Sequence, residues 1–169
     1  VNEEIAHGIP GSRVIQAGDL VNIDVSAELD GVFADTGASF LVPEADPRLV
    51  TLCRDGKRAM WEGIRAVKTG APLNGIGIAI GAFAKKHRYT LIENLASHGV
   101  GDSLHDEPGE IATWPDKSDR RLITEGLVFT VEPFLSLGGR MAEQRDEDDE
   151  WTLVADPPAP CVQYEHTIV

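Results

Sequence analysis

Two apolar, strand-like runs of this chain each end on an acidic residue, and this pattern constrains the possible folds more than any other feature. The run 20–24 ends on Asp24 and the run 127–132 ends on Glu132, and neither contains a Lys or Arg. Burying an ionised carboxylate without a partner costs several kcal/mol, so each buried acid needs a cation or strong hydrogen-bond donors. For a single acid, the alternative is a strand end that reaches water.

The two runs also resemble each other. Residues 18–24 and 126–132 both proceed from Gly through Leu-Val to an acid, with one residue inserted in the first. Asp35 and Glu165 form a second pair, since each stands shortly before a Thr. Matches this short also arise by chance, so the repetition alone leaves a duplicated fold and a coincidence both open. A duplication would place two carboxylates in each half of the molecule.

Local signals predict a hairpin followed by two helices. Asp30-Gly31 lies between two β-rich runs, which is typical of a tight hairpin turn. Residues 47–70 carry apolar side chains at three- and four-residue spacing, with Asp46 as N-cap and a proline at the first helical position. A second helix is predicted over residues 72–87, and most of its apolar residues are expected to pack in a core.

The rest of the chain indicates short strands. They are predicted over residues 91–96, 127–137, 151–154 and 162–169. The acidic stretch 143–150 contains no apolar residue and is predicted to be an exposed loop or hairpin tip. We therefore expect a single domain over residues 1–169 with an α+β fold, in which antiparallel strands carry two helices on one face.

Composition excludes several classes of function. The formal net charge is −13, which disfavours binding to DNA or other phosphate backbones. The longest apolar stretch, 76–84, is shorter than the roughly 18 residues of a membrane span, so no membrane association is expected. Cys53 and Cys161 lie far apart without CxxC spacing, which favours reduced thiols in a cytoplasmic protein.

Histidines beside glycines mark a candidate site. His98 is followed by Gly99 and Gly101, His105 follows seven positions later, and His7 precedes a glycine. Glycine lets the backbone bend closely around a ligand, so we expect His98 and His105 to face one cavity from a Gly-rich loop. A lone histidine is more often structural, but two in one such segment of a chain with five histidines favour a site.

Segments along the whole chain together resemble type I methionine aminopeptidases. In order, they are His7-Gly8-Ile9-Pro10, residues 18–25, Asp35-Thr36, residues 98–101, residues 105–108, residues 130–133 and residues 164–167. The resemblance implies the pita-bread (creatinase/aminopeptidase) fold, in which two pseudo-symmetric halves surround a curved antiparallel sheet with helices on its outer face. Such a fold would explain the repeated segments. In the family a further segment precedes His7, and we expect this chain to lack it.

The resemblance also implies a pair of metal ions. Asp24 would chelate one divalent cation, and Asp35 and Glu165 would bridge the two. His98 and Glu132 would complete the second metal site. Co, Mn, Fe and Zn all suit carboxylates combined with one imidazole, so two divalent ions from this group are the expected cofactors.

The activity implied is removal of an initiator Met that precedes a small residue. Glu132 would accept a proton from the attacking water, His105 would donate to the scissile carbonyl oxygen, and His7 would lie near the scissile nitrogen or the next residue. Trp151 would line the methionine pocket, its alternative being a core aromatic. Leu104 stands where many family members carry an aromatic pocket residue, which should widen or soften the pocket.

The expected partners are N-termini of peptides and nascent chains. The resemblance allows a transient contact with the ribosome, and a monomer is expected. Two other functions remain open at this stage. An Xaa-Pro aminopeptidase or prolidase shares the metal ligands and the fold, although it places its last Glu in an Arg-x-Glu-Asp setting that differs from Tyr164-Glu165-His166. The other is a catalytically impaired pita-bread binding protein, which would normally have lost one or more ligands.

Overall fold

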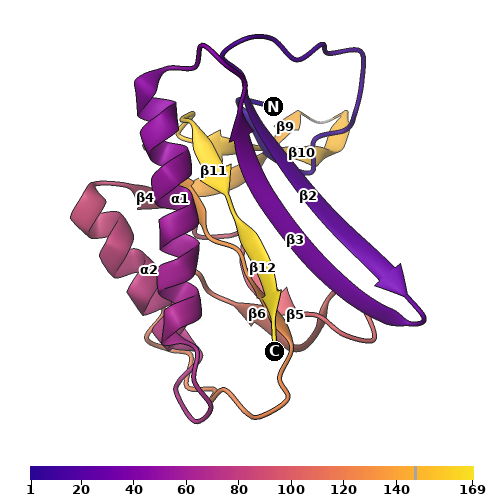
Figure 1. Cartoon of the computed structure of the whole chain (residues 1–169), viewed down its shortest axis with the longest axis vertical. Helices are drawn as coiled ribbons and strands as arrows, with labels where there is room; N and C mark the ends of the chain where they lie inside the picture. Colours follow the sequence, from indigo (N-terminus) through magenta and orange to yellow (C-terminus); the bar gives the residue numbers. More distant parts are fainter. Residues whose placement is uncertain (147) are drawn as a thin grey trace.

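The computed structural model describes residues 1–146 and 148–169 of the chain. Its helices are α1 (Pro47–Ala66) and α2 (Asn74–His87). Its strands are β1 (Glu4–Ala6), β2 (Leu20–Leu29), β3 (Val32–Leu41), β4 (Thr90–Leu91), β5 (Ser97–Gly99), β6 (Asp106–Ile111), β7 (Phe129–Val131), β8 (Phe134–Ser136), β9 (Met141–Asp146), β10 (Asp149–Asp156), β11 (Cys161–Gln163) and β12 (Glu165–Ile168). Both helices lie on one side of the strands (Figure 1), and the described strand pairs are antiparallel, which confirms the predicted α+β class.

The strands form three sheets. The six-stranded sheet has the order β2-β3-β12-β7-β5-β6, and the two three-stranded sheets have the orders β11-β8-β4 and β1-β10-β9. Apolar residues between the helices and the strands form the main core, which includes Leu52, Met60, Ile76, Ile80 and Phe129. The six-stranded sheet is therefore supported from one side by the helices.

The long β2–β3 hairpin is the predicted one. Asp30 and Gly31 have φ angles of 53° and 86°, so both turn residues adopt the left-handed conformation. Gly reaches this region without steric cost and Asp tolerates it, which makes the Asp-Gly pair suitable for a two-residue turn. The register Leu29↔Val32 follows directly from this turn.

Both predicted helices are confirmed, with small changes at their ends. The Asp46 side chain accepts a 2.8 Å hydrogen bond from the backbone N of Arg48, and α1 begins at the following proline. Helix α1 ends at Ala66 rather than near residue 70, because Val67 is extended. Helix α2 begins at Asn74, and its last residue is the predicted His87.

Two glycines let α1 approach its neighbours closely. A Cβ atom on Gly56 would lie 2.5 Å from Cγ2 of Val162, and one on Gly63 would lie 2.7 Å from Cδ1 of Ile80. Any side chain at these positions would force α1 away from β11 or from α2. The small residues of α1 thus set how near the helix lies to the strands.

Two strands predicted as continuous are in fact broken. The run 127–137 is divided at Glu132-Pro133 into β7 and β8, and the run 162–169 is divided at Tyr164 into β11 and β12. Pro133 has no backbone N–H to donate to a sheet. At both breaks the chain passes between the six-stranded sheet and the β11-β8-β4 sheet. These two crossings lie beside Glu132 and Glu165.

The segment around the histidines was predicted wrongly. His98 lies in strand β5, not in a Gly-rich loop, and the strand predicted over residues 91–96 is reduced to its first residue, Leu91 in β4. Strand β6 was not predicted at all, since it contains Pro108 and Gly109. It lies at the edge of the six-stranded sheet, where a missing N–H is tolerated.

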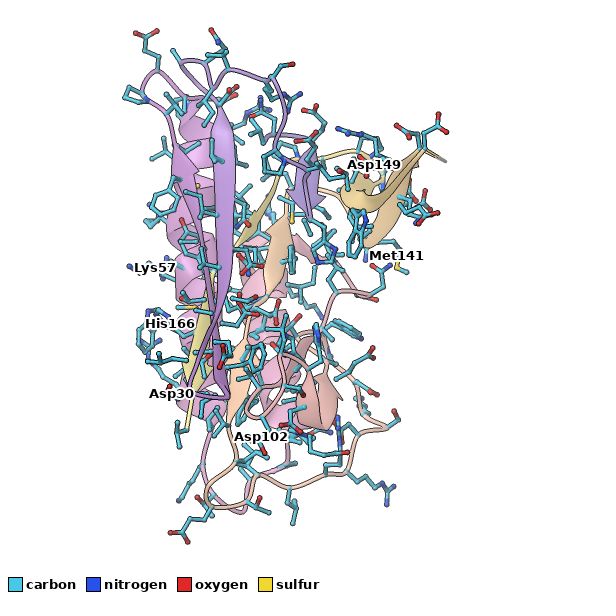
Figure 2. All side chains as sticks on the ribbon, turned by 90° about the vertical axis from the view of Figure 1, so that its right-hand side faces the viewer. Asp30, Lys57, Asp102, Met141, Asp149 and His166 are labelled. Atoms are coloured by element: carbon cyan, nitrogen blue, oxygen red, sulfur yellow. The ribbon has the colours of Figure 1, made fainter. Side chains whose placement is uncertain are left out.

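The acidic stretch is a hairpin rather than an extended loop. Residues 143–146 belong to β9 and residues 149–150 to β10, with Glu147 outside the described residues. The predicted hairpin tip is therefore confirmed. Figure 2 shows Met141 and Asp149 on this hairpin, on the opposite side of the molecule from Lys57 and His166. Among the described helices, none is both long and apolar enough to cross a membrane.

Candidate metal centre

The predicted metal ligands come from neighbouring strands of the six-stranded sheet. Asp24 lies in β2, Asp35 in β3, Glu165 in β12 and His98 in β5, and Glu132 directly follows β7. The strand order β2-β3-β12-β7-β5 brings these elements side by side although they are distant in sequence. In the β-register, Gly37 of β3 is the partner both of Asp24 and of Glu165.

Three of the predicted ligands form a compact, buried group. Ligand atoms of Asp35, His98 and Glu165 all lie within 4.8 Å of one another. Nε2 of His98 is 3.8 Å from Oδ2 of Asp35 and 3.4 Å from Oε1 of Glu132. Glu132 is itself buried, with 7% of its surface exposed. The imidazole of His98 thus faces the carboxylates of Asp35 and Glu132.

Asp24 differs from the sequence-based expectation. The sequence predicts an acid in a buried strand at this position, but β2 is an edge strand and Asp24 is exposed as a residue. Loss of hydration around its carboxyl group nevertheless raises its pKa, and the charge of the neighbouring Asp35 raises it further. Its closeness to the other acids is confirmed, whereas its burial is not.

The carboxylates destabilise one another when they are ionised. Burial is the main cause that raises the pKa of Glu165, and the negative charges of Glu132, Asp24 and Asp35 add to the rise. Burial likewise raises the pKa of Glu132, a rise that the hydrogen bond from Thr130 partly offsets. Several acids with raised pKa values in one place form a site prepared for positive charge.

Hydrogen bonds orient the ligand atoms. Nδ1 of His98 lies 2.9 Å from the carbonyl oxygen of Gly99, which can only accept, so Nδ1 carries a hydrogen and Nε2 is the nitrogen that can offer a lone pair to a metal. The hydroxyl of Ser26 donates to Oδ1 of Asp35 at 3.1 Å. Ser26 and Asp35 are register partners on β2 and β3, so this bond runs straight across the hairpin.

Sequence reasoning missed these supporting residues, although a signal was present. Polar residues stand two positions before three of the acids, in the pairs Asn22/Asp24, Thr130/Glu132 and Gln163/Glu165. Side chains two residues apart on a strand point to the same face. The hydroxyl of Thr130 donates to Glu132 and the amide of Gln163 donates to Glu165, at 2.7 Å and 2.9 Å.

The other two predicted histidines lie near this group. The ring centroids of His98 and His105 are 4.2 Å apart. Loss of hydration lowers the pKa of His105, and His98 and His7 contribute to the decrease. His7 directly follows β1 with a φ of 54° and is exposed. His105 lies immediately before β6, so its predicted loop position is correct while that of His98 is not.

The predicted pocket residues have different environments. Leu104 is partly buried, immediately before His105. Trp151 lies on β10 in a different sheet and has 66% of its surface exposed, which excludes its alternative role as a core aromatic. The roles of both residues in a substrate pocket stay predictions.

The residues present fit a divalent cation. Oε1 of Glu165 is buried and has no hydrogen-bond partner among the described residues. An acceptor buried in this way is costly unless a donor or a cation satisfies it. Carboxylate oxygens with one imidazole nitrogen are ligands for Mn, Fe, Co and Zn. The buried group of Asp35, His98 and Glu165 can therefore hold a metal ion.

Comparisons with known proteins agree with this chemistry. Residues 1–169 match the profile of metallopeptidase family M24. The chain is 43% identical to a methionine aminopeptidase of Staphylococcus epidermidis over 170 aligned positions, which cover 100% of this chain and 67% of that protein. It thus spans about two thirds of the length of that relative.

Solved structures show the same fold. A methionine aminopeptidase from Rickettsia prowazekii superimposes with a TM-score of 0.92 at 35% identity, covering 99% of this chain and 66% of that one. A prolidase from Pyrococcus horikoshii has a TM-score of 0.73 at 20% identity, covering 99% of this chain and 42% of that one, and this likeness concerns the fold alone. The predicted pita-bread fold is thereby confirmed, and the chain belongs to metallopeptidase family M24.

Proposed function

We propose that this chain is a methionine aminopeptidase that removes an N-terminal Met followed by a small residue. The observation that carries the proposal is the buried group of Asp35, His98 and Glu165, whose ligand atoms lie within 4.8 Å of one another. The chain that holds this group belongs to metallopeptidase family M24. The methionine aminopeptidase of S. epidermidis, 43% identical over this whole chain, supports the choice of substrate.

We further propose that Asp24 and Glu132 join this group to hold two divalent ions. Asp24 would bind one ion, Asp35 and Glu165 would bridge both, and His98 and Glu132 would complete the second site. Divalent ions bound here would supply an activated water and polarise the scissile carbonyl. The protein's part is to orient the carboxylates, to which the hydroxyls of Ser26 and Thr130 contribute.

Glu132 is the proposed proton acceptor. Its carboxylate is buried beside the imidazole of His98, and burial raises its pKa toward neutrality. An ionised carboxylate fixed beside the reacting water can take its proton and return it to the leaving amine. This role requires the side chain to stay in place while it gains and loses the proton, and the hydrogen bond from Thr130 holds it there.

His105 and His7 are proposed to contact the substrate. The lowered pKa of His105 favours the neutral ring, which can still donate one N–H. We propose that this N–H binds the scissile carbonyl oxygen and stabilises the charge that develops on it. His7, an electrostatic neighbour of both His105 and Asp24, is proposed to lie near the scissile nitrogen.

The two other readings of the sequence have less support. The likeness to the prolidase of P. horikoshii concerns the fold alone, because the sequence identity is 20%. A binding protein without metals would not need the buried acids and imidazole to converge as they do. A cytoplasmic location, a monomeric state, ribosome contact and the single-domain boundaries stay predictions.

The test combines metal stoichiometry with peptide turnover. Metal-free protein titrated with Mn or Co should bind two equivalents and then release Met from Met-Ala-Ser. An Xaa-Pro peptide without an N-terminal Met serves as the comparison substrate and should remain intact. Preferential cleavage of that peptide would support the prolidase reading. Absence of both metal binding and peptide turnover would refute the proposed aminopeptidase activity.

A further inference from the structure

Glu165 is held by a buried side chain that itself depends on two other residues. Nε2 of Gln163 donates a 2.9 Å hydrogen bond to Oε2 of Glu165, and Oε1 of Gln163 accepts a 2.9 Å hydrogen bond from Nδ2 of Asn22. Gln163 has 1% of its surface exposed, and so does Glu165. The chain of bonds therefore runs from β2 through β11 to the first residue of β12, away from solvent.

Donor and acceptor chemistry fixes the direction of this chain. The carboxylate of Glu165 accepts from the amide, so the Gln163 NH₂ group must face it and the Gln163 oxygen must face Asn22, whose NH₂ group can only donate. The backbone of Gln163 is also held, because its N donates to Oγ of Ser39 at 3.0 Å and its carbonyl accepts from that hydroxyl at 3.1 Å. Little freedom is left to the Gln163 side chain.

Gly37 provides the space for the Gln163 amide. A Cβ atom on Gly37 would lie 2.3 Å from Oε1 and 2.5 Å from Nε2 of Gln163. Gly37 is also the register partner of both Asp24 and Glu165. The atoms that a side chain would displace belong to the end of the Gln163 side chain and not to the backbone. A methyl group at position 37 would therefore move the amide and leave the backbone in place.

We propose that Gln163 is a positioning residue for the metal site and fixes the Glu165 carboxylate in its metal-binding orientation. Asn22 supports the Gln163 amide by a hydrogen bond, and Gly37 leaves room for it. The hydrogen bond to Oε2 restricts rotation of the carboxylate and therefore also fixes the direction of Oε1. Oε1 is the buried oxygen that has no hydrogen-bond partner among the described residues. Residues that hydrogen-bond to metal ligands commonly set metal affinity in this way. The inference rests on the proposed metal site but makes no use of the substrate.

The first test is metal affinity of the chain with Gln163→Met, measured by calorimetric titration of Mn into metal-free protein. Met matches the length of Gln but cannot donate, so Mn affinity should fall by about 10–100-fold. The free energy of unfolding of the metal-free variant, from urea titration, separates loss of metal binding from loss of fold. Gln144→Met on the exposed strand β9 is the matched control and should leave affinity unchanged.

The second test asks whether Gly37 acts through Gln163. Gly37→Ala should reduce Mn affinity as Gln163→Met does, because the new methyl group displaces the amide. In a Gln163→Ala background the methyl group has nothing to displace, so Gly37→Ala should cause no further loss. Additive losses in the double variant would overturn the proposal, as would wild-type affinity in Gln163→Met.

The outcomes also separate this inference from the proposed function. A chain that binds Mn but does not cleave Met-Ala-Ser refutes the aminopeptidase while the affinities of the variants still decide the role of Gln163. If the unaltered chain binds no Mn, the positioning role is refuted together with the metal site. The positioning role is supported if Mn affinity falls in Gln163→Met, Gly37→Ala and Asn22→Ala but not in Gln144→Met, while the free energy of unfolding is unchanged.

Discussion

The hydroxyl of Thr130 donates a 2.7 Å hydrogen bond to Oε1 of Glu132, two positions further along the chain. The same hydroxyl accepts a 3.0 Å hydrogen bond from the backbone N of His98 on the neighbouring strand. One fully buried oxygen thus links two predicted metal ligands that lie 34 positions apart in the sequence numbering, His98 and Glu132. Their relative position depends on a residue that is not a ligand.

Replacing this hydroxyl should weaken the metal site. Thr130→Val keeps the shape of the side chain but removes the donor, and a hydrogen bond to a charged group contributes about 1.5–3 kcal/mol. We expect a lower Mn affinity in calorimetric titration and a lower kcat. Thr130→Ser retains the hydroxyl and should stay close to the unaltered chain; equal losses in both variants would show that packing, and not the hydrogen bond, is responsible.

The proposed bridging acids should be needed for both metal ions. Asp35→Ala and Glu165→Ala each remove a buried carboxylate from the group that lies within 4.8 Å. We expect fewer than two bound equivalents of Mn or Co by elemental analysis, with loss of Met-Ala-Ser cleavage. Glu62→Ala, which removes a partly exposed acid of α1, is the control. Full activity in either bridging variant would contradict the assignment.

The role of His105 can be separated from metal binding. If His105 donates to the developing oxyanion, His105→Ala should reduce kcat by about 10²–10³. Metal stoichiometry should not change, because His105 is not one of the proposed ligands, although its ring lies against that of the proposed ligand His98. Paired measurement of kcat and bound metal tests this, and a variant that loses metal would instead place His105 among the ligands.

Local signals predicted much of the fold because each depends on residues close in sequence. Asp30-Gly31 and Asp46 satisfy their turn and cap with near neighbours, and both are as expected. Local patterns do not reveal the strand that holds His98, because one of its partners, β7, is distant in sequence and the other, β6, contains Pro108 and Gly109. The exposure of Asp24 depends on β2 being an edge strand, which no local pattern shows.

The candidate site was predictable to a similar extent. The ligand types followed from unpaired acids, and their roles from the family resemblance, whereas the contacts between strands did not. Gln163 and Gly37 meet because β3 and β12 pair across the sheet, a relationship that depends on the whole topology. Sequence spacing reveals which polar residue shares a face with an acid, but not which residue across the sheet leaves room for it.

Two glycines of the helices should respond in opposite ways to a single methyl group. Gly56→Ala places a Cβ 2.5 Å from Val162 and should destabilise the chain by about 1–3 kcal/mol through overpacking. Gly75, in the first turn of α2, has no atom beyond its own helical turn within 4 Å of its Cβ position, so Gly75→Ala should stabilise by about 0.4–1 kcal/mol, mainly by restricting the unfolded chain. Urea unfolding of both variants checks the close approach of α1 to β11; equal effects would contradict it.

The metal-free chain should lose stability as the pH rises from about 4.5 to about 8. An unfolded glutamate ionises near 4.5, whereas burial raises the pKa of Glu132 to about 8 in the folded chain. Within this window the folded state holds more protons than the unfolded state, so the free energy of unfolding falls as pH increases. Glu165 has its pKa raised in the same direction and should extend the decrease to higher pH.

Bound metal should reverse this dependence. A cation requires the ionised carboxylates, so its affinity rises with pH and its binding releases protons. Urea unfolding across pH 5 to about 8, with and without saturating Mn, should give curves that diverge as pH increases. Glu132→Gln removes one titrating group and should flatten the metal-free curve. A metal-free chain that gains stability over this range would show that the acids are already compensated by the protein itself.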